Sequence, residues 1–340
     1  MTSPINIIAV GGGKGGIGKS VVCTNLAAGM ALSGQKVILM DTDFGASNLH
    51  ALLGISNPEH GFQDFFNTDI IDPATLLLDT GISNLKFVSG AGDNPGSANI
   101  DSESIGTIIS FIKKLEADTI LLDLGPGTNY NVIDFFNIST QGVVLTTPEM
   151  TSVMKTFSFI RAALFRRISL AFQAYPEIQK MVDHSDPTNA DMESYTTGLL
   201  RSKFKEHFPN YTESLDSLIK DFTPGLVVNR VRNRKDLMAG DNLLKLVKKF
   251  LEVEVTYLGY IIESDRVRDS IDEMIPFLIK YSIPDTKSLS LICWSDHHAA
   301  LFLIHFGMLC DSNSSITGAS KVGVDDSSVL SDTTSNAFKI

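Results

Sequence analysis

Two lysines and a run of glycines lie together near the start of the chain. Residues 11–20 read GGGKGGIGKS and directly follow an apolar run at 5–10. Positions 13–20 fit the phosphate-loop pattern G-x-x-x-x-G-K-[ST], which requires a strand before it and a helix after it. Glycines let successive backbone N–H groups close around anionic oxygens, and the N-terminus of the following helix favours the same charge. The spacing predicts a nucleotide-binding site; an ordinary glycine-rich turn is the alternative.

The last residues of this loop carry the groups that would meet a triphosphate. Lys19 would reach the β- and γ-phosphates, and the Ser20 hydroxyl would bind Mg²⁺. The residues of this segment that we expect to contact the nucleotide are Gly13, Lys14, Gly15, Gly16, Ile17, Gly18, Lys19, Ser20 and Val21. A nucleotide phosphate chain and a magnesium ion are therefore the expected ligands.

Acidic residues follow two other apolar runs. Asp41 and Asp43 come at the end of one, and Asp123 ends another, which reads ILLD. In an open sheet of parallel strands, ligands bind beside the carboxyl ends of the strands. We therefore expect these carboxylates to lie beside the glycine-rich loop, with Asp123 serving the metal ion. An acidic turn that caps a helix is the alternative for Asp43 and for Asn48, which follows it.

A second lysine lies inside the loop, five residues before Lys19. The resulting motif, KGGIGKS, is the "deviant" Walker A loop, and with it the chain resembles the MinD/ParA family of P-loop ATPases. The resemblance covers about residues 5–285, except for an insertion. The resemblance implies ATP or ADP as the nucleotide, and a homodimer in which Lys14 crosses the interface to the phosphates held by the partner. Such a cation acts as an arginine finger does, worth about 10³ to 10⁵ in rate. A solvated loop lysine is the alternative for Lys14.

The resemblance also implies roles for the residues at the strand ends. It makes Asp43 the residue that orients the attacking water, and it puts Asp41 near the Mg²⁺ shell. Asn48 would lie close to the γ-phosphate, and Asp123 would be the Walker B carboxylate. The implied catalytic residues are Lys14 and Asp43, and the implied metal-site residues are Ser20, Asp41, Asp43 and Asp123.

Two later segments complete the implied site. DLGPG at 123–127 resembles the family's switch II, usually D-x-P-A-G, with the proline one place later. There Gly127 would approach the γ-phosphate. Asn229 and Arg230 stand where the family uses an asparagine to read the adenine edge, which suits an amide that donates and accepts at once. A simple strand-end turn is the alternative for Asn229.

Other strand ends resemble the family less specifically. Glu149 lies in a TTPE segment similar to the family's T-x-P-E element near the dimer face, and a helix N-terminal acid is the equal alternative. Glu263 replaces the proline of a family loop that packs against the base. The sequence from Asp41 to Gly54 and the Val-Asn-Arg segment at 228–230 most resemble the MinD/FlhG branch of the family. That branch implies an ATP-gated regulator of division site or flagellar placement, acting with a protein partner or a membrane.

Composition bounds the competing functions. The formal net charge is −11, which argues against nucleic acid as a partner, since a basic face is needed to neutralise phosphates. A DNA- or cargo-partitioning ATPase of the ParA type is therefore the second reading, and a nucleotide-responsive scaffold without turnover is the third. Iron–sulfur carriers of the same superfamily need paired cysteines, whereas Cys23, Cys293 and Cys310 are scattered.

The alternation of short apolar runs with helical stretches predicts an α/β fold. We expect a mostly parallel twisted sheet with helices on both faces, as in P-loop NTPases, plus a helical insertion. The predicted strands are 5–10, 36–40, 85–88, 119–123, 143–147, 226–229 and 256–260, and the predicted helices are 19–33, 102–115, 153–170 and 243–250.

Three regions are expected along the chain. Residues 1–288 would form the ATPase domain with an insertion at about 170–223, followed by a C-terminal helix at 289–310 and a disordered tail at 311–340. The helix is apolar and lacks Lys and Arg, so we expect it to pack on the domain; a membrane or partner helix is the alternative. No signal-peptide pattern is seen, and a cytoplasmic location, with peripheral contact at the inner face of the cell membrane, is expected.

Overall fold

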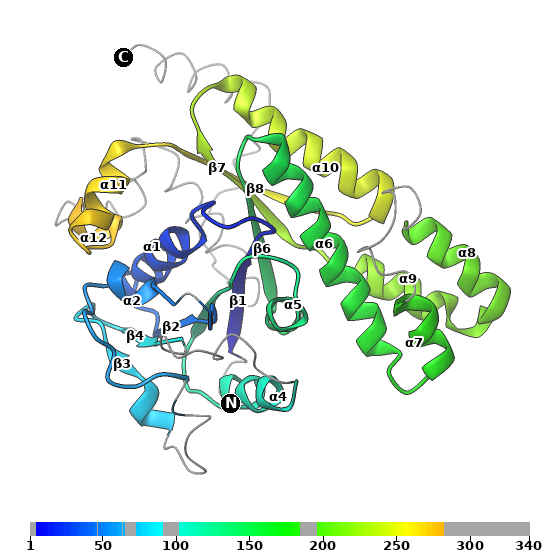
Figure 1. The fold of residues 1–340 in the computed structure, drawn as a ribbon, viewed down its shortest axis with the longest axis horizontal. Helices are drawn as coiled ribbons and strands as arrows, with labels where there is room; N and C mark the ends of the chain where they lie inside the picture. Colours follow the sequence, from blue (N-terminus) through cyan, green and yellow to red (C-terminus); the bar gives the residue numbers. More distant parts are fainter. Residues whose placement is uncertain are drawn as a thin grey trace, which may run out of the picture. The chain divides into compact units, whose positions relative to one another are not determined.

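The protein is built on one eight-stranded sheet, described from a computed structural model over residues 5–45, 47–62, 64, 73–90, 102–183 and 196–281 (Figure 1). The strand order is β3-β4-β2-β5-β1-β6-β7-β8, and every neighbouring pair is parallel except β3 with β4. The strands are β1 (Asn6–Gly11), β2 (Val37–Asp41), β3 (Leu78–Asp79), β4 (Leu85–Val88), β5 (Thr119–Asp123), β6 (Gln141–Thr146), β7 (Gly225–Val231) and β8 (Thr256–Ile262). The predicted α/β fold class is confirmed.

Helices cover both faces of the sheet. The α-helices of the described residues are α1 (Lys19–Leu32), α2 (Leu49–Leu52), α4 (Ser102–Ile112), α5 (Tyr130–Asn137), α6 (Met150–Ala171), α7 (Pro176–Asp183), α8 (Thr197–His207), α9 (Thr212–Lys220), α10 (Met238–Leu251), α11 (Asp265–Asp272) and α12 (Phe277–Lys280). Helix α1 packs on β2, β4 and β5 and is itself in contact with α2 and α12, whereas α5, α6 and α10 pack on β1, β6 and β7 from the other side (Figure 1).

The central strands are apolar at almost every position because both of their sides are covered. All five residues of β2 and of β5 are buried, so these strands read VILMD and TILLD rather than alternating. Apart from Thr119 at the start of β5, the only polar side chains in these two strands are those of Asp41 and Asp123, the last residue of each strand. Chain direction thus delivers both carboxylates to one edge.

The order of the strands places β1 beside both halves of the sheet. β5 pairs with it on one side and β6 on the other, so the chain leaves β1 first toward β2 and later toward β6. Ligands of open α/β sheets bind at such a reversal, outside the carboxyl ends of the strands. The glycine-rich loop follows β1 directly and therefore lies at this point.

Three helices lie between α6 and β7, in the region where the sequence predicts a helical insertion. Within the described residues these are α7, α8 and α9, and their apolar faces join the main core rather than a core of their own. Phe172 at the end of α6 packs on Phe204 of α8 at 5.4 Å between ring centroids. Arg201 of α8 also forms ion pairs with Asp216 and with Glu252, which follows α10. The insertion is therefore anchored to both long helices.

Several sequence predictions fall outside the described residues. These are the C-terminal helix at 289–310, the tail at 311–340 and the cysteines Cys293 and Cys310. Of the helices in the described part of the chain, none combines the length and apolar character that a bilayer crossing demands.

Replacing Phe204 by alanine should destabilise the protein by about 3–5 kcal/mol, because its ring is 0% exposed and leaves a cavity between α6 and α8. Phe208→Ala is the matched control, since that ring is only partly buried at the end of the same helix. Urea unfolding of both variants measures the difference. Equal, small losses would contradict the anchoring of the insertion.

Candidate functional site

The phosphate loop runs from the end of β1 to the start of α1 and is shaped by its glycines. Gly16 and Gly18 have φ angles of 73° and 91°, which residues other than glycine rarely adopt. Gly13 presses against α6, because a Cβ there would lie 2.0 Å from the backbone oxygen of Lys155. The loop is therefore held in one conformation by its own backbone and by a neighbouring helix.

The two lysines of the loop have different surroundings. Lys19 begins α1 and is 7% exposed, in the position where a phosphate would meet the helix N-terminus. Lys14 is only partly buried, and Gly15 and Gly16 beside it are exposed. Ser20 and Val21 lie in the first turn of α1. The predicted loop residues are thus brought together around one site.

Asp123 stands at the end of β5, level with Val10 of β1 and Asp41 of β2. Its side chain is 2% exposed, and its Oδ1 atom has no hydrogen-bond partner among the described residues. Burial, followed by the charge of Asp41, raises the pKa of Asp123 to about 7, while the Ser20 hydroxyl and Lys19 act in the opposite direction. A buried carboxylate oxygen without a partner, next to the Ser20 hydroxyl, is the donor set that suits Mg²⁺ bound by a P-loop protein.

Asp41 serves a different purpose from Asp123 although the two are neighbours. It accepts hydrogen bonds from Ser47 Oγ at 2.7 Å, from the N–H of Asp43 at 3.0 Å and from the N–H of Leu49 at 3.2 Å. Burial nevertheless raises its pKa to about 6. The resemblance implied a place near the metal shell, which stays a prediction; in the structure the three hydrogen bonds tie this carboxylate to Asp43, Ser47 and Leu49. The role of Ser47 as a donor to Asp41 was not predicted from the sequence. The signal that could have indicated it is a hydroxyl residue six positions after an aspartate at a strand end.

Asp43 lies against the loop that follows β5. A Cβ at Gly125 would be 3.2 Å from the Oδ1 atom of Asp43. Thr42 joins the same two segments, because its N–H and its hydroxyl both donate to the carbonyl oxygen of Asp123, at 3.0 and 2.8 Å. Asn48 is exposed just before α2, and its side chain does not cap that helix. The 41–49 and 123–127 segments are thus in direct contact.

The 123–127 segment also reaches the phosphate loop. Pro126 lies over it, with 3.8 Å between its Cβ and a Cβ added at Gly15, and Gly127 has a φ of 97°. Three segments that are far apart in the sequence therefore meet at one edge of the sheet, as the strand-end pattern predicted.

Charged residues surround the exposed side of the loop. The hydroxyl of Thr147 donates to the carboxylate of Glu149 and, ahead of the charges of Lys14 and Arg230, lowers its pKa. Arg232 forms an ion pair with Glu263, the residue that stands in place of the family's proline. Asn229 is buried and donates to the carbonyl oxygen of Ile17 in the phosphate loop. The edge of β7 is thus part of the site.

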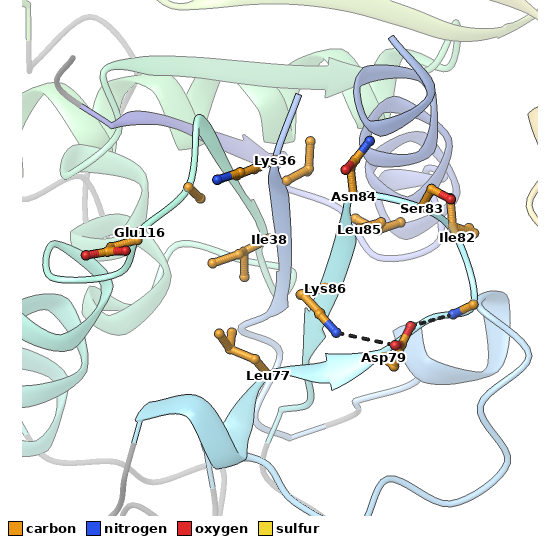
Figure 2. Close-up of a pocket in the computed structure, with 13 residues that line it drawn as sticks. Lys36, Ile38, Leu77, Asp79, Ile82, Ser83, Asn84, Leu85, Lys86 and Glu116 are labelled. Atoms are coloured by element: carbon orange, nitrogen blue, oxygen red, sulfur yellow. Dashed lines mark hydrogen bonds and ion pairs between the residues drawn. The ribbon is translucent and has the colours of Figure 1, made fainter. Parts of the chain in front are cut away.

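A separate pocket lies at the opposite edge of the sheet, at the start of β2 and β4 (Figure 2). Asp79 there accepts from Lys86 Nζ at 3.3 Å and from the N–H of Gly81 at 3.0 Å. Lys36 and Glu116 line it from other segments. The Asp79 carboxylate is already engaged by local donors, so the phosphate-loop edge is the better candidate for chemistry.

Comparison with known proteins agrees with this geometry. The family described as "ParA: NUBPL iron-transfer P-loop NTPase" matches residues 4–170. The chain contains a ParA-family P-loop NTPase domain. The predicted resemblance to MinD/ParA ATPases is confirmed.

Named relatives of this ParA-family domain cover part of the chain. The septum site-determining protein MinD of Synechocystis sp. is 31% identical over 148 residues, 43% of this chain and 55% of that protein. The antiactivator FleN of Pseudomonas aeruginosa is 28% identical over 160 residues, 46% of this chain and 56% of that protein. The chain thus spans about half the length of the curated relatives that it matches.

A solved relative has the same fold. It is the septum site-determining protein MinD from Pyrococcus horikoshii, complexed with Mg-ADP, and it aligns with a TM-score of 0.56 and 18% identity over 89% of this chain and 96% of that chain. Cys23, the one cysteine among the described residues, is buried, and burial raises the pKa of its thiol well above its usual value.

Gly13→Ala should destabilise the ligand-free protein by about 1–3 kcal/mol, because the new Cβ can be accommodated only if α6 moves away from the ParA-family loop. Gly15→Ala is the matched control, since its Cβ would meet nothing closer than Pro126 at 3.8 Å. Unfolding by urea without nucleotide compares them. Identical midpoints would contradict the close packing of loop on helix.

Proposed function

We propose that this chain binds Mg-ATP at the phosphate loop, dimerises with ATP and hydrolyses it slowly, and thereby regulates where or in what number a cellular structure is built. The observation that carries the proposal is the buried Oδ1 atom of Asp123, which has no hydrogen-bond partner in the part of the chain that the structure describes and lies beside Ser20 and Lys19. A buried polar atom without a partner costs free energy, and the Mg²⁺ of a bound nucleotide would compensate for that cost.

The roles of individual residues follow from their positions. Ser20 and Asp123 would hold Mg²⁺, which when bound neutralises charge on the β- and γ-phosphate oxygens. Lys19 would bind the same oxygens from the start of α1. Asp43 would orient the attacking water, since it lies against Gly125 at the edge where a γ-phosphate would end. Asp41 would hold Asp43 in place through the latter's N–H.

The contact between the 41–49 and 123–127 segments supports a switch. Thr42 is tied to Asp123 by two hydrogen bonds, so a change at the γ-phosphate end would reach both segments together. Two segments ordered by a γ-phosphate and released on hydrolysis are a common device of nucleotide-dependent regulators. Switching, rather than rapid turnover, is therefore the output we propose.

Exposed apolar side chains support dimerisation at the same edge. Tyr130, Met150 and Met238 are 58%, 60% and 58% exposed. They are the first residues of α5, α6 and α10, which begin after β5, β6 and β7, and parallel strands end at one edge. Large apolar side chains that are exposed at the edge carrying a charged site are typical of a surface that becomes buried. A second copy would bring its own Lys14 to the phosphates.

The partner of this switch is proposed from the named relatives. A MinD and an antiactivator, FleN, both match the chain, so a protein partner in a localisation system, within the cytoplasm or at the inner face of the cell membrane, is the favoured target. A ParA-type DNA-partitioning role is the second candidate, and the net charge of −11 disfavours it.

Lys14→Ala should retain ATP binding but lose ATP-dependent dimerisation, and its turnover should fall by about 10³-fold, because the cation supplied to the partner's phosphates is gone. Light scattering with ATP and a phosphate-release assay measure the two effects. Lys19→Ala is the comparison, since it should lose ATP binding itself, and Lys36→Ala, on the far edge, should behave as wild type. Wild-type turnover by the Lys14 variant would refute a shared site.

Asp43→Ala should bind ATP and dimerise yet remain in the dimeric state, because the water is no longer oriented. We expect phosphate release to fall about 10²- to 10⁴-fold. Asp79→Ala, an exposed aspartate at the opposite edge, is the control. Rapid phosphate release from the Asp43 variant would remove its assigned role.

A further inference from the structure

The side chain of Asn229 connects the end of β7 to the phosphate loop. Its Nδ2 atom donates a hydrogen bond of 2.7 Å to the carbonyl oxygen of Ile17, 212 residues earlier in the chain. Its Oδ1 atom accepts from the N–H of Arg230 at 2.9 Å. The residue is 4% exposed, so water cannot easily replace either partner. The two bonds together fix the orientation of the amide, with its donor toward the loop.

The end of β7 is shaped to hold this amide. Arg230 has a φ of 59°, in the left-handed region that residues with a side chain seldom adopt. At the same place the register of β7 against β8 shifts, between Val228 and Val231. The distortion turns the N–H of Arg230 toward the side chain of the preceding residue. A backbone cost of this kind is characteristic of functional edges.

The loop side of the contact fits the amide closely. A Cβ at Gly18 would lie 2.4 Å from the Nδ2 atom of Asn229. Gly18 also has a φ of 91°. A glycine is therefore required at this position both by the backbone angle and by the neighbouring amide. The bond from Asn229 to the loop exists only because of that glycine.

Holding the Ile17 oxygen sets the direction of the next N–H. A trans peptide is planar, so the C=O of Ile17 and the N–H of Gly18 point in opposite directions. With the oxygen held on the β7 side, the N–H of Gly18 points away from Asn229. It does so directly before Lys19, at the start of α1, where N–H groups have no partner within the helix and an anion is favoured.

We propose that Asn229 is a positioning residue for the phosphate chain, aiming the N–H of Gly18 at the phosphates by holding the Ile17–Gly18 peptide. This role presupposes the nucleotide-binding function proposed above and deepens it. It differs from the adenine reading expected from the sequence, because it concerns the phosphates alone. Its effect should therefore be the same for any triphosphate, whatever the base.

The test compares three ligands with matched variants of the full chain. Asn229→Ser and Asn233→Ser carry the same neutral change four residues apart. The shorter serine cannot reach Ile17 from position 229, whereas at 233 it can still cap the following turn, as Asn233 does. Calorimetric titration with ATP, GTP and inorganic tripolyphosphate, each with Mg²⁺, gives the affinities. Asn229→Leu, which keeps the branched shape of the side chain but removes both of its polar atoms, is the second variant, and thermal unfolding without ligand monitors the fold.

We expect both Asn229 variants to lose affinity for all three ligands by the same factor, about tenfold, and Asn233→Ser to match wild type. A loss confined to ATP would overturn the proposal in favour of base reading. Reduced thermal stability with unchanged affinity for tripolyphosphate would also overturn it, since the role would then be structural. Failure of the wild-type protein to bind any of the three would instead refute the nucleotide-binding function.

Discussion

Two buried carboxylates, side by side at the ends of β2 and β5, are the constraint on which the site depends. Asp41 and Asp123 are register partners, and burial raises the pKa of both. Three donors satisfy Asp41, whereas Asp123 keeps one oxygen without a partner among the described residues. This difference in hydrogen bonding gives the two carboxylates different roles. Asp41 is tied to the segment that follows β2, whereas Asp123 is the carboxylate that we propose for a ligand that brings positive charge.

The phosphate loop owes its shape to elements that come much later in the chain. The backbone of α6 presses on Gly13, and Asn229 at the end of β7 holds the Ile17 oxygen. The loop is thus supported from two sides, over and above the freedom of its glycines. Helix α6 also carries the inserted helices on its far end, so packing in the insertion and the conformation of the loop share one rigid element.

Most of the sheet could be predicted because buried parallel strands leave a plain signal. The runs VILMD and TILLD are apolar throughout, and the observed strands β2 and β5 occupy them. By contrast β3 spans only Leu78–Asp79 and pairs antiparallel at the edge, so its two residues carry no periodicity to detect. Helix α5 was also missed, since it has only eight residues and follows a glycine-rich turn.

The candidate site divides in the same way. The local amino-acid sequence was enough to locate Lys19, Ser20, Asp43 and Asp123, because a phosphate loop and acidic residues at strand ends are defined by their spacing along the chain. The donors to Asp41, the pairing of Arg232 with Glu263 and the bond from Asn229 to Ile17 could not. Each joins partners through the fold, and local periodicity does not report such contacts.

The sequence by itself determined the chemistry offered at the loop and the edge of the sheet at which it gathers, since strand direction and spacing decide both. Only the tertiary structure decided which of two adjacent carboxylates keeps an oxygen without a hydrogen-bond partner among the described residues, and which side chains hold the loop. The physical reason is that burial and hydrogen-bond satisfaction belong to the packed molecule. The same aspartate or asparagine is a ligand or a support according to the donors and acceptors that folding brings to it.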